Sequence, residues 1–284
     1  MSGAPGLSEI LYDELVRRAL GEDLGRAGDI TTDAIVPAER EARALVVARQ
    51  AGRIAGLEPA LHAFRLLDPG CRAEICRPDG SDAKPGETVA RVAARARALL
   101  TGERTALNLL GRLSGIATAT RDVVARLAGL KTRVACTRKT TPGLRALEKY
   151  AVRVGGGEPH RYGLDDAVLV KDNHVAIAGG VGEAVRRARV GVGHLVKLEV
   201  EVDTLDQLDE ALEAGVDAVL LDNMSPETLR EAVRRCRGRA LTEASGGIRP
   251  ENVRAVAETG VDLVSLGWLT HSAPALDVAL DVES

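Results

Sequence analysis

The segment CTRKTTPGLRALEKYAVRVGGGEPHRYGLDDAVLVKDNH, residues 136–174, decides both the fold and the chemistry of this chain. An apolar run from Val134 to Cys136 leads into it, and a second run from Ala167 to Val170 ends on Lys171. Short apolar runs bounded by turn residues are typical of buried strands. We therefore predict two strands that each deliver cations at the point where the chain leaves a sheet.

The cations of this segment fall into two groups. A helix is expected from Pro142 through Tyr150. Arg145, Lys149 and Arg153 stand at helical spacing, which predicts an ordinary solvated face. The remaining cations stand where buried strands stop, and we interpret them as a pocket for anions. They are Arg138, Lys139 and Lys171.

The composition is that of a globular protein with a local rather than a global charge signal. The chain has 284 residues, 45% hydrophobic and 28% charged, with a net charge of -3. Aromatic residues make up only 2%, so stacking platforms for single-stranded nucleic acid are not expected. Together with the net charge, this argues against a nucleic-acid partner.

The four cysteines lack the spacing of zinc ligands, and we expect reduced thiols in a cytoplasmic protein. A signal-peptide pattern and an apolar run long enough to cross a bilayer are both missing from the sequence. No membrane partner is therefore expected.

Two domains are predicted. Residues 1–113 read as an α+β domain, and residues 114–273 as a β/α domain. The segment Leu276–Val282 alternates with period two, so we expect the tail 274–284 to add a strand to the N-terminal domain.

From Leu130 onward, strands and helices alternate strictly, and almost every strand ends on a residue with chemical function. An internal echo, Glu213–Asp222 against Glu258–Gly267, repeats one β/α unit. A doubly wound sheet would concentrate such residues at one switch point, whereas a TIM-like barrel collects them from all strand ends. We therefore predict an incomplete TIM-like β/α barrel of about six or seven strands. The six clearest strands are Thr132–Thr137, Ala167–Lys171, Leu195–Val202, Ala218–Asp222, Ala240–Glu243 and Leu263–Leu266.

Acidic residues face one side of the expected barrel. Glu199 and Glu201 alternate with apolar residues, so both carboxylates point the same way, and Asp222 ends the next strand. Mg²⁺ with a phosphorylated sugar would satisfy all three carboxylates. The alternative is that one glutamate pairs with a barrel lysine, Lys171 or Lys197.

A phosphate site is expected near the last strands. Glu243–Ile248 contains Ser245, Gly246 and Gly247 before Pro250, which predicts a strand, a glycine turn and a helix start. Gly267 occupies the echo position of Asp222 and leaves room for phosphate, and the candidate histidines are His160 and His271.

With these motifs in view, the chain resembles the quinolinate phosphoribosyltransferase family. The matching segments run in family order along nearly the whole chain. They are 28–32 (GDITT), 103–108 (ERTALN), 112–117 (RLSGIA), 137–145 (TRKTTPGLR), 155–157 (GGG), 160–161 (HR), 171–174 (KDNH), 199–201 (EVE), 221–223 (LDN), 243–247 (EASGG) and 269–272 (LTHS).

The resemblance implies transfer of a phosphoribosyl group from 5-phosphoribosyl 1-pyrophosphate to quinolinate, followed by loss of the 2-carboxylate, in NAD biosynthesis. Its implied catalytic residues are Lys139, Lys171, Glu201 and Asp222, and its implied cofactor is Mg²⁺, held by Glu201 and Asp222 through water or substrate. Its implied substrate-binding residues are Arg104, Arg138, Lys139, His160, Arg161, Lys171, Glu201, Asp222, Ser245, Gly246, Gly247, Gly267 and His271.

The resemblance also implies a homodimer with shared active sites, in which Arg104 completes the partner's site, while larger assemblies stay open. One departure is Pro159, where the family usually has asparagine. Two rival functions remain: the paralogous transferase of molybdenum-uptake operons, and a sensor that binds a phosphorylated metabolite without turnover.

Overall fold

The structure is a computed structural model that describes residues 6–283. The chain divides into two compact units. Unit 1 comprises the described residues up to Arg121, together with Thr141–Gly156 and the residues from Ser272 onward. Unit 2 comprises Asp122–Thr140 and Gly157–His271.

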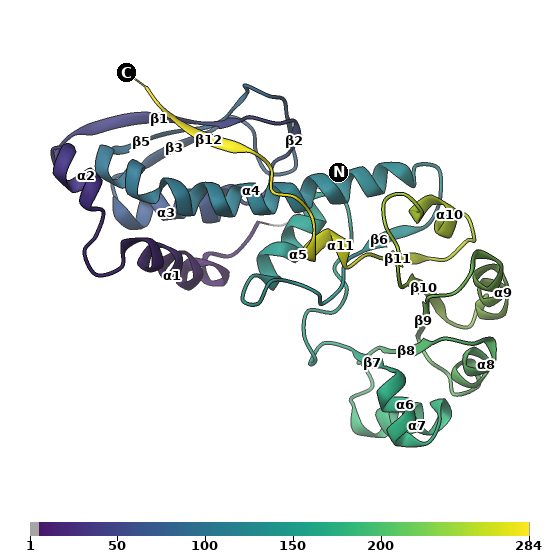
Figure 1. Ribbon diagram of the computed structural model, residues 1–284. Helices are drawn as coiled ribbons and strands as arrows, with labels where there is room; N and C mark the ends of the chain where they lie inside the picture. Colours follow the sequence, from purple (N-terminus) through teal and green to yellow (C-terminus); the bar gives the residue numbers. More distant parts are fainter. Residues whose placement is uncertain (1–5, 284) are drawn as a thin grey trace. The chain divides into compact units, whose positions relative to one another are not determined.

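Unit 1 is built on an antiparallel sheet with the strand order β12-β1-β5-β3 (Figure 1). The C-terminal strand β12 pairs with β1, with Ala44 opposite Val282. The strands are β1 (Glu41–Ala48), β3 (Arg72–Ile75), β5 (Thr88–Arg95) and β12 (Val278–Val282), with β2 (Gly52–Arg53) and β4 (Asp82–Ala83) as a separate pair. The helical elements are η1 (Glu9–Leu11), α1 (Asp13–Leu24), α2 (Ile30–Ile35), α3 (Leu57–Leu67), α4 (Ala96–Arg126) and α5 (Arg145–Val154).

The boundary expected between residues 113 and 114 falls inside α4, which continues to Arg126. Two of its three glycines, Gly111 and Gly115, lie against the tail. A Cβ atom on Gly115 would lie 2.0 Å from the Pro274 carbonyl oxygen, and one on Gly111 would lie 2.8 Å from that of Leu276. Glycine is therefore required for the close approach of backbone to backbone, so these glycines do not end the helix.

Helix α5 differs from its prediction in two ways. It begins at Arg145 rather than at Pro142, because Gly143 adopts a positive φ of 83° and turns the chain first. Lys149 is 0% exposed, so the expected solvated face of Arg145, Lys149 and Arg153 is wrong at its central residue. Helical spacing identifies a shared face but not what covers it.

Unit 2 is a parallel six-stranded sheet with the order β6-β11-β10-β9-β8-β7, with helices along its outer side (Figure 1). All six predicted strands are present: β6 (Arg133–Ala135), β7 (Val168–Val170), β8 (Leu198–Val202), β9 (Ala218–Asp222), β10 (Leu241–Ser245) and β11 (Leu263–Ser265). The helices are α6 (Asp172–Ala178), α7 (Val181–Gly191), α8 (Leu205–Glu213), α9 (Pro226–Cys236), α10 (Val253–Ala257) and α11 (Trp268–His271).

The sheet curves as an incomplete barrel. Strands β6 and β7 are its two ends, and no strand pairing joins them within residues 6–283. Beside β6, Glu158 forms an isolated parallel bridge with Ala135, which acts as a seventh, one-residue strand. The prediction of an incomplete barrel with about six or seven strands is therefore confirmed.

Local signals position the helices of the barrel with mixed success. Thr204 and Gln207 form a capping box at the start of α8, and Pro226 stands at the first helical position of α9. Pro250 does not open a helix, because α10 begins only at Val253. No helix within the described part of the chain has both the length and the apolar character needed to cross a membrane.

Candidate active site

Strands β7, β8 and β9 bring Lys171, Glu201 and Asp222 together at their carboxyl ends. In β8 the buried Leu198, Val200 and Val202 alternate with the half-buried Glu199 and Glu201, as the period of a strand requires. The prediction that both carboxylates face one side is confirmed.

Lys171 follows β7, and its Nζ atom lies 3.5 Å from Glu201 Oε2. Burial raises the pKa of Glu201, the charge of Lys171 opposes this, and the charge of Asp222 adds to it. The lysine–glutamate contact raised as an alternative is therefore present with Lys171, whereas Lys197 pairs with Asp217 at 2.7 Å. Because β8 and β9 are neighbouring strands, Glu201 and Asp222 place two oxygen-ligand side chains at adjacent strand ends, and these could hold Mg²⁺.

The turn after β10 packs against the turn after β9. Ser245 stands opposite Asp222 in the sheet, and the Asn223 backbone N–H donates to the Ser245 carbonyl oxygen at 3.0 Å. Gly246 has a φ of 89°, and a Cβ atom there would lie 2.3 Å from Asn223 Oδ1. Gly247 is also left-handed, with a φ of 60°. The glycine turn thus forms, although the helix expected directly after it starts later.

Lys139, Gly267 and His271 also lie together. The buried Thr270 hydroxyl donates to the Lys139 carbonyl oxygen at 2.9 Å, tying α11 to the loop after β6. A Cβ atom on Gly267 would lie 3.0 Å from Lys139 Cδ and 3.3 Å from His271 Cδ2. Glycine at this position therefore lets a lysine and a histidine approach the same piece of backbone.

Two arginines, Arg138 and Arg161, have buried donor atoms that no hydrogen bond within residues 6–283 satisfies. The Nε atoms of Arg138 and Arg161 are buried and have no hydrogen-bond partner within the described residues. Burial, and then the nearby charge of Arg138, lowers the pKa of Arg161. Buried donors without partners cost free energy, so this pair is suited to an incoming anion.

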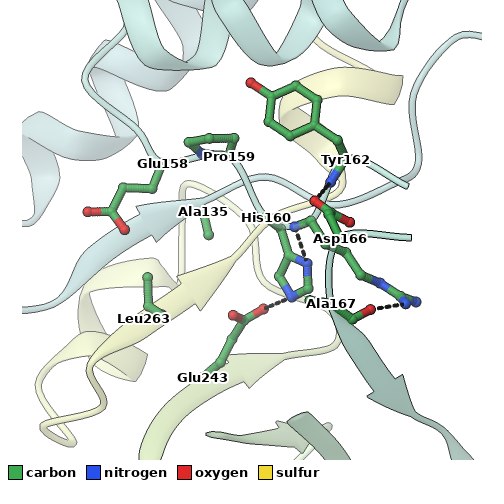
Figure 2. Close-up of a pocket in the computed structure, with 10 residues that line it drawn as sticks. Ala135, Glu158, Pro159, His160, Tyr162, Asp166, Ala167, Glu243 and Leu263 are labelled. Carbon is green, nitrogen blue, oxygen red and sulfur yellow. Dashed lines mark hydrogen bonds and ion pairs between the residues drawn. The ribbon is translucent and has the colours of Figure 1, made fainter. Parts of the chain in front are cut away.

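A cavity of about 390 Å³ lies beside His160 and Arg161, between β6, β10, β11 and the loop 158–167 (Figure 2). Its lining is Ala135, Glu158, Pro159, His160, Arg161, Tyr162, Asp166, Ala167, Glu243 and Leu263. The cavity therefore shares His160 and Arg161 with the predicted site. The predicted catalytic residues Lys139, Lys171, Glu201 and Asp222 do not line it.

Arg104 is the one predicted site residue that lies in unit 1. It stands on α4 with 65% of its side chain exposed, and its nearest carboxylate is Glu103 at 3.8 Å. An exposed arginine in so weak an ion pair is available to bind another group.

Two residues near the predicted site were not among its predicted members. Glu243 occupies the interior of β10 beside His160, and Asn223 adopts the positive φ of 51° that shapes the turn before Ser225. The alternation of Leu241, Glu243 and Ser245 in β10 could have identified Glu243. Asn223 could not have been identified in this way, because its role depends on a backbone conformation that the sequence does not reveal.

Comparison with known proteins gives one consistent result. The family described as "Quinolinate phosphoribosyl transferase, N-terminal domain" matches residues 29–114, and "Quinolinate phosphoribosyl transferase, C-terminal domain" matches residues 116–281. The chain belongs to the quinolinate phosphoribosyltransferase family. The resemblance drawn from the sequence motifs is therefore confirmed.

Relatives within this family are similar over almost their full length. A nicotinate-nucleotide pyrophosphorylase [carboxylating] of Mycobacterium leprae is 46% identical, over 97% of this chain and 100% of its own. A probable enzyme of the same name from Bacillus subtilis is 44% identical, over 97% and 95%. The solved nicotinate-nucleotide pyrophosphorylase of Francisella tularensis superposes with a TM-score of 0.94 at 36% identity and covers 100% of both chains.

Proposed function

We propose that this chain is a carboxylating nicotinate-nucleotide pyrophosphorylase. It transfers the phosphoribosyl group of 5-phosphoribosyl 1-pyrophosphate to quinolinate and releases pyrophosphate and CO2, giving nicotinate mononucleotide for NAD biosynthesis. Family membership supports the reaction class. The observation that carries the proposal is the meeting of cations and carboxylates at the carboxyl ends of one parallel sheet.

Quinolinate brings two carboxylates, and the basic side of the site is suited to them. Arg138 and Arg161 carry buried Nε donors that an anion would satisfy, and arginine can orient a carboxylate with two parallel hydrogen bonds. His160 belongs to the same group, and Lys139 and Lys171 supply further positive charge. Neutralising two substrate carboxylates in a partly buried site requires such a cluster.

The phosphoribosyl donor is assigned to the segments that follow β10 and β11. The glycine turn with Ser245, Gly246 and Gly247, together with Gly267 and His271, would receive its phosphate, because left-handed glycines let backbone approach a phosphate closely. Glu201 and Asp222 would hold the ribose hydroxyls and Mg²⁺. When bound, Mg²⁺ would neutralise the pyrophosphate leaving group.

The chain's own residues then act mainly by charge and position. The bond between ribose C1 and the pyrophosphate oxygen breaks as the quinolinate nitrogen forms its bond to C1, and positive charge develops on the ribose. Carboxylates at Glu201 and Asp222 stabilise that charge, while Lys139 and Lys171 hold the anions in line. CO2 then leaves C2, and the pyridinium ring accommodates the electron pair until a proton replaces it, so no side-chain nucleophile is needed.

The active assembly is proposed to be a homodimer in which Arg104 of one subunit reaches the site of its partner. The exposure of the Arg104 side chain supports this assignment. A cytoplasmic location is also proposed, supported by the four cysteines, all in the described residues, none of which forms a disulfide.

The test is mass-spectrometric detection of nicotinate mononucleotide from quinolinate and 5-phosphoribosyl 1-pyrophosphate, with and without Mg²⁺. The expected result is product formation that requires the metal. Binding of the phosphorylated donor without turnover would instead support the sensor function. Turnover with another acceptor but not with quinolinate would support the molybdenum-operon paralogue.

A further inference from the structure

Both ring nitrogens of His160 are already engaged inside the protein. Nδ1 lies 2.8 Å from the backbone N–H of Arg161 and accepts its hydrogen bond (Figure 2). Nε2 lies 3.0 Å from Glu199 Oε2, and Glu243 Oε1 is 3.6 Å away. The ring is therefore an internal connector between β8 and the loop that carries Arg161.

These contacts determine which nitrogen carries the proton. A nitrogen that accepts a hydrogen bond from a backbone N–H cannot itself be protonated, so Nδ1 carries its lone pair. Nε2 then carries the hydrogen and donates it to the Glu199 carboxylate. This is the arrangement by which a carboxylate selects a histidine tautomer in many polar sites.

The cluster is well enclosed. The side chains of His160, Glu199 and Glu243 are 14%, 13% and 4% exposed. In such surroundings a hydrogen bond to a charged group is stronger than in water, and its geometry is held tightly. Glu199 lies on the same face of β8 as Glu201 and one alternation step before it, away from the carboxyl end of the strand.

Through Nδ1, the His160 ring binds the backbone N–H of Arg161, the arginine that faces the anion pocket. Besides its backbone contact to His160, Arg161 donates through Nη1 to the Ala167 carbonyl oxygen at 3.1 Å. Two internal hydrogen bonds thus orient Arg161, while its buried Nε atom has no hydrogen-bond partner in the described residues.

We infer that Glu199 is a positioning residue for the anionic pyridine substrate: it fixes His160 in the Nε2-protonated tautomer, and His160 in turn fixes Arg161. This inference rests on the proposed function and deepens it, because it adds Glu199 and the tautomer of His160 to the features that determine quinolinate binding.

The first test reads the tautomer directly. The full-length protein, labelled with ¹⁵N-histidine, is studied at pH 7.5 by two-bond ¹H–¹⁵N correlation, and His160→Gln assigns one of the five histidines. We expect a lone-pair nitrogen at Nδ1 and a protonated Nε2. A protonated Nδ1, in either the other tautomer or the imidazolium, would overturn the inference.

The second test separates positioning from a general structural role. Glu199→Leu removes the acceptor, and we expect the KM for quinolinate to rise about tenfold while that for 5-phosphoribosyl 1-pyrophosphate stays within about twofold. Glu199→Gln retains an acceptor oxygen and should recover most of the loss. An equal rise in both KM values, or no recovery with glutamine, would refute the inference.

A double-mutant cycle completes the design. In a His160→Ala background, Glu199→Leu should raise the quinolinate KM by less than about twofold, because the two residues act through one connection. Fully multiplicative effects would contradict it. The matched controls are His194→Gln and Glu213→Gln, both exposed and outside the cluster. If the wild-type chain fails to turn over quinolinate at all, the proposed function fails, and the tautomer measurement still decides the internal connection.

Discussion

Lys171 Nζ and Glu201 Oε2 lie 3.5 Å apart at the ends of the neighbouring strands β7 and β8. The charge of Lys171 does not fully offset the cost of burying the Glu201 carboxylate, because burial still raises the pKa of Glu201. Residues retained in such unfavourable surroundings are often those that a reaction requires.

Glu201→Gln should lower kcat at least about a hundredfold, because a neutral amide cannot stabilise positive charge on the ribose. The same substitution should not lower the free energy of unfolding at neutral pH. A carboxyl group whose pKa rises on folding contributes stability below its unfolded pKa and loses that contribution as the pH rises through the folded value. The variant should therefore be at least as stable as wild type at pH 7.5.

The measurement is urea unfolding of wild type and Glu201→Gln between pH 4 and pH 7.5. The difference in unfolding free energy should move in favour of wild type as the pH falls. Movement in the other direction would show that the glutamate has a lowered pKa and that Lys171 fully compensates it.

Arg138→Ala should raise the KM for quinolinate by about ten- to a hundredfold, because it removes a buried charged donor from the pocket. The KM for 5-phosphoribosyl 1-pyrophosphate should change much less. Steady-state kinetics with each substrate varied in turn will measure both. Arg237→Ala, at an exposed position, is the control, and an unchanged quinolinate KM would remove Arg138 from the site.

Gly246→Ala and Gly247→Ala form a matched pair that separates crowding from backbone conformation. Both glycines have positive φ, which costs an alanine about 1–2 kcal/mol. Only at Gly246 would the new Cβ atom collide with Asn223, since nothing lies within 4 Å of the one at Gly247. Gly246→Ala should therefore destabilise the protein more, and should raise the KM for the phosphoribosyl donor about tenfold. Equal effects on urea unfolding at the two positions would contradict the crowding argument.

Arg112→Met tests the polar connection inside unit 1. Arg112 donates to the fully buried Glu148 carboxylate at 2.9 Å and to the Ala273 carbonyl oxygen at 3.1 Å. Glu148 also accepts from the Thr141 hydroxyl at 2.8 Å. Leaving its charge buried without the arginine should cost about 3–5 kcal/mol of unfolding free energy. Arg230→Met, which removes an exposed pair with Glu227, should cost less than about 1 kcal/mol. A small loss for Arg112→Met would mean that Glu148 does not depend on it.

Arg104→Ala should abolish activity when present in every subunit. Mixed with an Arg138→Ala chain, it should regain part of the activity if sites are shared, because a heterodimer then holds one site with both arginines intact. The measurement is the specific activity of co-refolded mixtures against each variant alone. Activity no higher than that of the separate variants would argue against a shared site.

Patterns within short segments determined much of this protein. The six parallel strands, the common orientation of Glu199 and Glu201, and the capping box at Thr204 all follow from periods of two and from neighbouring residues. The motifs that led to the family are also continuous stretches, which is why the reaction could be predicted from residues alone.

Only the tertiary structure decided which of these groups meet and which are buried. Lys149 has the spacing of a surface lysine and is fully buried, and Glu199 reaches His160, 39 residues earlier, rather than a barrel lysine. Arg112 binds Ala273, 161 residues away. Such contacts depend on how the chain closes over long sequence distances, and local periodicity carries no information about that closure.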